Sequence, residues 1–111
     1  MTKNDSISVI LSTVPDRKTG EKIATTLVEG RFAACVNILP NITSIYRWKD
    51  KIEHEEELLL IIKSADERIP ALIEKIQEIH PYEVPEIIEI EVKRGGNSYL
   101  NWVVENSTPD A

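Results

Sequence analysis

Residues 52–80, IEHEEELLLIIKSADERIPALIEKIQEIH, decide the fold of this 111-residue chain, because they allow two interpretations. The glutamates and the Leu/Ile run have good helix propensity, so one helix over the whole stretch is a real alternative. Against it, Leu58 to Ile62 shows no 3.6-residue spacing, and Ser64-Ala65-Asp66 reads as an interruption with an N-cap. We therefore expect a strand over residues 52–63 and a separate helix after Asp66.

The helix expected after Asp66 carries an apolar stripe at the i, i+3, i+4, i+7 spacing. Pro70 lies in its first turns, where a missing N–H costs little. His80-Pro81 ends it, because the residue before a proline disfavours the helical region. The stripe consists of Ile69, Leu72, Ile73, Ile76 and Ile79.

The N-terminal part of the chain predicts a strand followed by a helix. Alternating apolar residues predict the strand over residues 7–14, and the additional Ile10 indicates burial on both faces. Asp16 is expected to cap the helix, which runs to about Glu29 and ends at Gly30.

An extended stretch over residues 31–48 comes next in the sequence. Pro40 cannot donate to a sheet ladder, so it marks a bend, a bulge or an edge. Lys49-Asp50-Lys51 is the expected hairpin connection to the strand over 52–63, although it lacks the glycine of the commonest tight turns.

The C-terminal part predicts a strand over residues 84–92, a loop over 93–96 and a short helix. Asn97 is expected to cap that helix. The polar tail after it should fray. The helix carries Tyr99, Leu100, Trp102 and Val103.

The resulting order is strand, helix, strand, strand, helix, strand, with an added terminal helix. Two βαβ-like halves that share one antiparallel sheet form the α+β plan called ferredoxin-like. We expect one domain over residues 7–106, with flexible ends at 1–6 and 107–111. The helices would cover one face of the sheet, while the strands at 7–14 and 58–62 look apolar on both faces. The uncovered face predicts an oligomer.

Composition excludes several classes of protein. The net charge of −6 argues against nucleic acid as a partner, since an acidic chain repels phosphates. No apolar run is long enough to span a membrane, and residues 1–6 show no signal peptide. The single cysteine, Cys35, allows no intrachain disulfide and fits the reducing cytoplasm, where we expect the protein to reside.

Few residues indicate chemistry. The chain has no P-loop, GxGxxG, GxSxG, CxxC or HExxH motif, and no nucleophile can be paired with His54 or His80, so we expect no enzyme. His80 at a helix end could bind a transition metal or simply cap the helix. Cys35 is expected to be a buried apolar thiol, and the run Glu53–Glu57 a solvated strand face.

Four segments together resemble the CutA family of divalent-cation tolerance proteins. Their order and spacing agree over almost the whole chain, together with Thr13, Pro15 and Asp16. The segments are Arg31–Pro40 (RFAACVNILP), Ser44–Glu53 (SIYRWKDKIE), His80–Ile87 (HPYEVPEI) and Tyr99–Trp102 (YLNW).

The resemblance implies a ferredoxin-like homotrimer with aromatic-lined clefts between subunits, and a strand over residues 52–63. It also implies a role in tolerance of copper and other divalent metals, with Cu²⁺ or another divalent cation as the ligand. The family's copper ligands are a cysteine and two adjacent histidines, and their positions here hold Ser12, Ile79 and His80. Only His80 keeps a ligand, which Glu83 or Glu86 could supplement.

Three functions are compatible with these observations. The first is metal homeostasis, with His80 as a ligand. The second is a ligand-sensing trimer, by fold-level analogy with PII signalling proteins. The third is a structural trimer that scaffolds a partner. For the second, the residues expected to line the cleft are Tyr46, Trp48, Lys63, His80, Tyr82 and Glu86.

Overall fold

Four antiparallel strands form one sheet in the computed structural model, which describes residues 6–109. The strand order is β2-β3-β1-β4. Residues 52–63 belong to a strand, so the alternative of one long helix over residues 52–80 is wrong. The strands are β1 (Ile7–Val14), β2 (Cys35–Trp48), β3 (Lys51–Ala65) and β4 (Ile88–Glu91). The helices are α1 (Arg17–Glu29), the 3₁₀ turn η1 (Asp66–Arg68), α2 (Ile69–Ile79) and α3 (Asn97–Ser107).

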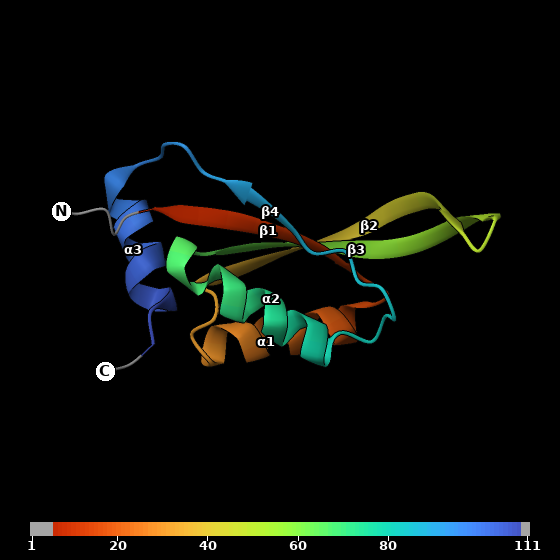
Figure 1. Cartoon of the computed structure of the whole chain (residues 1–111), viewed down its shortest axis with the longest axis horizontal. Helices are drawn as coiled ribbons and strands as arrows, with labels where there is room; N and C mark the ends of the chain where they lie inside the picture. The colour runs from red at the N-terminus through yellow and green to blue at the C-terminus, as the bar shows by residue number, and fades with distance from the viewer. Residues whose placement is uncertain (1–5, 110–111) are drawn as a thin grey trace.

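The β2–β3 hairpin is the longest feature of the molecule and extends beyond the helices as an arm (Figure 1). Its loop consists of Lys49 and Asp50, since Trp48 pairs with Lys51. Both loop residues have positive φ, 50° and 67°, as a type I′ turn requires. The expected hairpin is therefore confirmed without a glycine.

Pro40 coincides with an irregularity in β2, as expected. The pairing of β2 with β3 shifts register between Leu39 and Ile42, and Asn41 between them has a φ of 65°. A bulge of this kind accommodates the missing N–H of proline and increases the local twist. Beyond it, the hairpin departs from the rest of the sheet.

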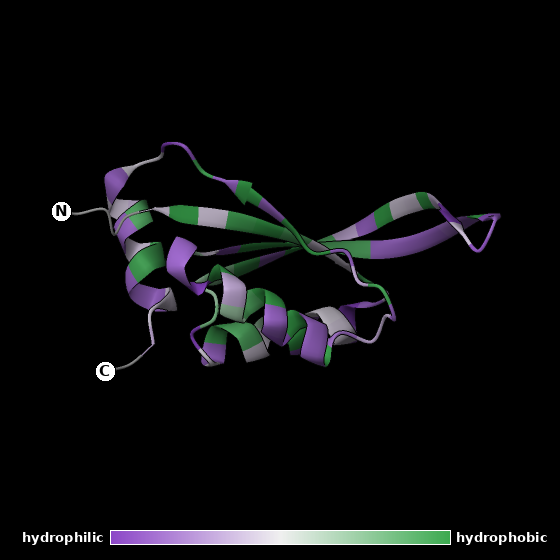
Figure 2. Cartoon of the chain, viewed as in Figure 1, coloured by the Kyte–Doolittle hydropathy of each residue, from purple (hydrophilic) through white to green (hydrophobic). Residues whose placement is uncertain are grey.

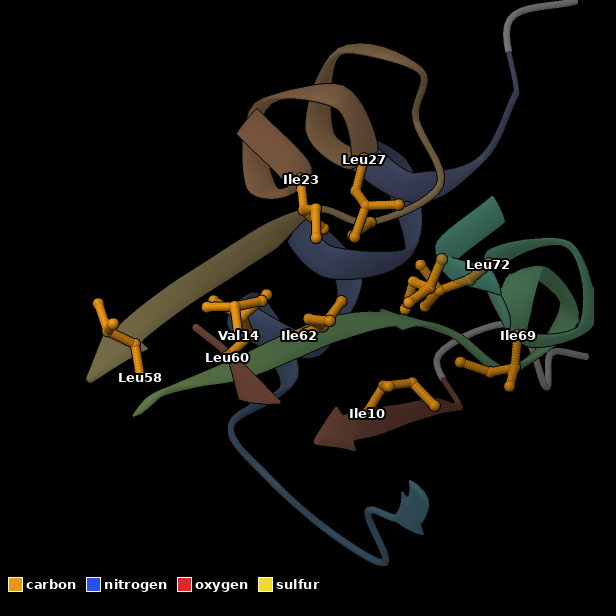
Figure 3. Close-up of a cluster of buried hydrophobic side chains, with 11 residues drawn as sticks. Ile10, Val14, Ile23, Leu27, Leu58, Leu60, Ile62, Ile69 and Leu72 are labelled. Carbon is orange, nitrogen blue, oxygen red and sulfur yellow. The ribbon is translucent and has the colours of Figure 1, made fainter. Parts of the chain in front are cut away.

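The main core lies between one face of the sheet and helices α1 and α2, which lie on the same side of it (Figure 1). Figure 3 shows Ile23 and Leu27 of α1 pointing toward Val14, Leu60 and Ile62 of the sheet. A smaller cluster of Ile7, Ala34 and Val103 attaches α3 to one end of the molecule. Asp16 caps α1 as expected, because its carboxylate accepts from the Thr19 N–H at 2.8 Å.

Two expectations for the C-terminal part are wrong. The last strand begins at Ile88 rather than at residue 84, since Pro85 cannot donate to the ladder. The residue that caps α3 is Gly96, and no side chain caps the helix; Asn97 is its first residue.

The C-terminal helix also extends further than expected. It includes Ser107, whose buried hydroxyl donates to the Val103 carbonyl and accepts from the Ala65 N–H. The helix therefore ends at the first residue of the range 107–111, for which a flexible tail stays a prediction. Of the flexible ends that the sequence predicts, residues 1–5 and 110–111 lie outside the described residues.

The sheet face opposite α1 and α2 carries apolar side chains, of which Leu39, Ile88 and Ile90 are exposed, while α3 packs on Ile7 at one end of the face. Residues directly opposite each other in an antiparallel pair share a face, and Leu11 is opposite both Ile61 and Ile88. Ile88 and Ile90 are 49% and 48% exposed. Figure 2 shows hydrophobic residues along β1 and β4. This open face consists of Val9, Leu11, Leu39, Leu59, Ile61, Ile88 and Ile90.

Candidate functional site

A groove of about 700 Å³ lies between the β2–β3 hairpin and the segment that leads from α2 to β4. Cross-strand pairing builds one side of it, because Ser44 is opposite Glu55 and shares its face. The other side is the segment 81–86, which proline keeps out of regular structure at both Pro81 and Pro85. The lining residues are Thr13, Ser44, Ile45, Tyr46, Trp48, Glu55, Glu57, Pro81, Tyr82, Glu83, Val84 and Glu86.

A hydrogen bond between Tyr82 and Glu57 joins the two sides of the groove. The Tyr82 hydroxyl donates to Glu57 Oε2 at 2.6 Å. Glu57 is only 6% exposed, and no other hydrogen bond to its carboxylate occurs within residues 6–109. Burial is the largest cause that raises the pKa of Tyr82. The hydrogen bond to Glu57 and the negative charge of Glu57 raise this pKa further. The phenol is therefore a fixed donor to a buried negative charge.

The electrostatic character of the groove is acidic. Four carboxylates line it, at Glu55, Glu57, Glu83 and Glu86, and the described lining contains no Lys, Arg or His. Desolvation and then the charges of Glu55, Glu57 and Glu53 raise the pKa of Tyr46. Such a surface favours cations and repels anions.

His80 lies behind this wall and is 8% exposed. Its Nε2 lies 2.8 Å from the Thr13 carbonyl oxygen, and its Nδ1 lies 3.1 Å from the Tyr82 backbone nitrogen. A carbonyl can only accept and an N–H can only donate, so Nε2 carries the proton and Nδ1 accepts. The imidazole thus ties Tyr82 to the end of β1, and both of its nitrogens are in use.

The other two positions implied by the resemblance hold no metal ligand. Ser12 is fully buried, and its hydroxyl has no hydrogen-bond partner in the described chain. Ile79 packs against the main core. Within residues 6–109, no group of three or more His, Cys, Asp or Glu is placed to hold a metal ion.

Four of the residues expected in the cleft do line the groove: Tyr46, Trp48, Tyr82 and Glu86. Lys63 does not. It is opposite Cys35, and its ammonium lies 5.7 Å from the centre of the Tyr99 ring. Cys35 is partly exposed rather than buried.

Sequence reasoning assigned Glu53–Glu57 to a solvated strand face, which holds for the exposed Glu55 but not for the buried Glu57. Their alternation along β3 was the available signal, because residues two apart on a strand share a face. The burial of Glu57 depends on Tyr82, which is 25 residues away in the sequence. Spacing alone could not reveal that contact.

Comparison with known proteins agrees with the resemblance. The family model described as CutA1 divalent ion tolerance protein matches residues 8–106. Protein CutA of Mus musculus is 48% identical over 98 residues, which are 88% of this chain and 55% of that protein. The divalent-cation tolerance protein CutA of Thermus thermophilus is 46% identical over 99 residues, which are 89% of this chain and 96% of that protein. The chain thus spans about half of the mouse relative and nearly all of the bacterial one.

Solved structures show the same α+β architecture. The divalent cation tolerance protein Cut A1 of Thermus thermophilus superposes with a TM-score of 0.89 at 44% identity, covering 92% of this chain and 99% of that one. CutA of Xylella fastidiosa gives 0.90 at 39% identity, covering 92% and 98%. Since the family model matches nearly the whole described chain, and relatives above 40% identity carry the same name, the chain belongs to the CutA1 family of divalent ion tolerance proteins.

Proposed function

We propose that the protein acts in tolerance of divalent cations, copper among them, by binding metal weakly and without catalysis. The observation that carries the proposal is the acidic groove, whose four carboxylates have no basic side chain among its described lining residues. Carboxylate oxygens and a negative potential attract divalent cations. The relatives are named for tolerance rather than for a reaction.

His80 is the proposed nitrogen ligand, and its hydrogen bonds explain why binding would be weak. A metal at Nδ1 must displace the Tyr82 N–H, and a metal at Nε2 must displace the Thr13 carbonyl. Either displacement breaks a buried hydrogen bond, which weakens metal binding by about 1 kcal/mol. Binding would then loosen the segment that forms the groove wall.

Calorimetric titration of Cu²⁺ tests this proposal. We expect binding to the wild type that is lost in His80→Ala and retained in His54→Ala, the matched control on the exposed part of β3. Equal binding in wild type and His80→Ala would exclude His80 as a ligand. Circular dichroism of both variants checks that a lost signal does not reflect unfolding.

We further propose that the fold is the ferredoxin-like βαββαβ plan and that the working unit is a homotrimer. The strand order β2-β3-β1-β4 supports the plan, since it puts both helix-containing connections across one intervening strand. The open apolar face supports assembly, because an exposed sheet face of this kind needs a cover.

A ligand-sensing role is the second candidate. The observation that favours it is the size and lining of the groove: about 700 Å³ with three aromatic side chains, in the range of small-molecule sites. A thermal-shift screen of nucleotides and metabolites tests it. Stabilisation by one class of compound would support sensing, and a flat response across the screen would count against it.

The cytoplasm remains our proposed compartment, supported by the single cysteine. No helix within residues 6–109 is long and apolar enough to cross a membrane. Relatives in Arabidopsis thaliana and Oryza sativa are named chloroplastic and the CutA of Archaeoglobus fulgidus is named periplasmic, so members of the family occur in more than one compartment.

A further inference from the structure

We propose that the groove binds a linear organic dication or polycation, an aliphatic di- or polyamine in its ammonium form. The inference rests on the second candidate function, since it names the ligand class of the same groove. Three features carry it: a buried carboxylate without a counter-ion, further carboxylates on both sides of the groove, and an aromatic lining between them.

Glu57 supplies the first feature. Its carboxylate is almost fully buried at the groove and receives one hydrogen bond, from Tyr82. No Lys, Arg or His within residues 6–109 forms an ion pair with it. A buried carboxylate without a counter-ion carries a desolvation penalty, which a bound cation would offset.

The remaining carboxylates determine how many positive charges the ligand carries. Glu55 and Glu57 are two residues apart on β3, so they share a face at a spacing of about 7 Å. Glu83 and Glu86 approach from the opposite side of the groove. Ammonium groups separated by an alkyl chain match carboxylates that line both sides of the groove.

The aromatic side chains determine what lies between the charges. Tyr46, Trp48 and Tyr82 line the groove together with Ile45 and Val84. Methylene groups pack on aromatic faces, and an ammonium over such a face gains a cation–π attraction. A hydrated metal dication gains neither, and the described chain presents no cluster of three metal ligands.

Calorimetry with three matched compounds at constant ionic strength tests the proposal. The probe is 1,4-diaminobutane; Mg²⁺ has the same charge without the alkyl chain, and 1,4-butanediol has the same chain without the charge. We expect the diamine to bind at least tenfold more tightly than either control compound. Equal binding of Mg²⁺, or no diamine binding at millimolar concentration, would overturn the proposal.

Two variants assign the binding to the groove. Glu57→Gln keeps an oxygen that can accept from Tyr82 but removes the charge, and should weaken diamine binding at least tenfold. Glu56→Gln is the matched control, because Glu56 accepts from Thr43 on the other face of the same strand. Equal effects of the two substitutions would show only a general attraction to an acidic chain and would exclude the groove.

The outcome is separable from that of the metal proposal. Copper binding that depends on His80, together with no diamine binding, would overturn this inference and leave divalent-cation tolerance standing. Diamine binding that is lost in Glu57→Gln, with copper binding unchanged in His80→Ala, would support this inference and exclude His80 as a metal ligand. Diamine protection against thermal unfolding, seen in wild type and Glu56→Gln but not in Glu57→Gln, would support the inference independently.

Discussion

At the scale of single residues, the hydroxyl of Ser12 is a buried polar group that lacks a hydrogen-bond partner in the described chain. Burying such a hydroxyl costs about 1–3 kcal/mol. We therefore expect Ser12→Ala to raise the free energy of unfolding by about 1 kcal/mol, as measured by urea denaturation. Ser64→Ala is the matched control, since Ser64 is equally buried but donates to the Phe32 carbonyl at 2.7 Å. It should destabilise the fold, and equal effects of the two substitutions would contradict this reasoning.

Tyr82 gives a second residue-level prediction, which concerns pH. Burial and then Glu57 raise the pKa of Tyr82 in the folded chain, whereas the unfolded chain keeps the ordinary value of about 10. The protonated phenol therefore contributes stability that is fully present below pH 10 and is lost as the pH rises above it. We expect Tyr82→Phe to lower the free energy of unfolding at neutral pH by about 2 kcal/mol, the value of a hydrogen bond to a charged group.

The same substitution should flatten the loss of stability at alkaline pH. Urea denaturation at several values on both sides of pH 10 measures this slope for the wild type and for Tyr82→Phe. Tyr99→Phe is the control, because it leaves the Tyr82–Glu57 pair intact. If the free energy of unfolding falls equally with pH above pH 10 in the wild type and in Tyr82→Phe, the hydrogen bond to Glu57 does not raise the pKa of Tyr82.

At the scale of elements, the tip of the β2–β3 hairpin stores backbone strain. Lys49 and Asp50 both adopt the left-handed region, which costs a residue with a side chain about 1–2 kcal/mol, with aspartate at the lower end. Asn-Gly is the sequence that this turn prefers. We expect Lys49→Asn with Asp50→Gly to raise the free energy of unfolding by about 1 kcal/mol.

Urea denaturation of the turn variant against Asp50→Ala checks this prediction. Alanine tolerates the left-handed region less well than aspartate, so Asp50→Ala should destabilise the hairpin. A turn variant that is no more stable than Asp50→Ala would show that the positive φ values do not limit stability.

The elements also show how much of the fold the sequence could predict. The N-cap at Asp16, the irregularity at Pro40 and the helix after Asp66 are local, and each was predicted from neighbouring residues. The N-cap expected within residues 64–66 is wrong, because β3 runs to Ala65 and α2 begins at Ile69 without a side-chain cap. The start of β4 and the cap of α3 were not. Apolar Val84 and Ile87 fit a strand, but pairing also needs a partner and an N–H, which Pro85 lacks.

The groove shows the same difference between features that neighbouring residues predict and features that depend on residues distant in the sequence. Aromatic residues near element ends indicated Tyr46, Trp48 and Tyr82, because such residues often line clefts, and all three line the groove of the single chain. That they line a cleft between subunits stays a prediction. Glu57 was not among the residues expected, and Lys63 lies outside the groove of the single chain. Both differences concern which side chains meet across the fold. The register of β3 determines which side chains meet, and the propensities of the residues carry no information about register.

At the scale of the whole molecule, the two faces of the sheet have different surroundings. Helices α1 and α2 cover one face (Figure 1). The other face carries apolar residues of all four strands, of which Leu39, Ile88 and Ile90 are exposed in the described chain. Burying such a face contributes about 25 cal/mol per Å² of apolar area, whereas each chain brings a net charge of −6 that opposes association.

The proposed trimer therefore predicts which substitutions separate the subunits. Ile90 is 48% exposed at the centre of β4 on the open face, and Ile90→Lys should replace apolar contact with a buried charge in the assembly. Val28→Lys is the matched control, since Val28 on α1 is 41% exposed on the helical side. Analytical ultracentrifugation should find a trimer for the wild type and Val28→Lys and a monomer for Ile90→Lys.

Because the negative charges of the subunits repel each other, added salt should strengthen the association of the wild type. A wild type that remains monomeric at micromolar concentration would leave the open face for some other partner, and a trimeric Ile90→Lys would place the interface elsewhere.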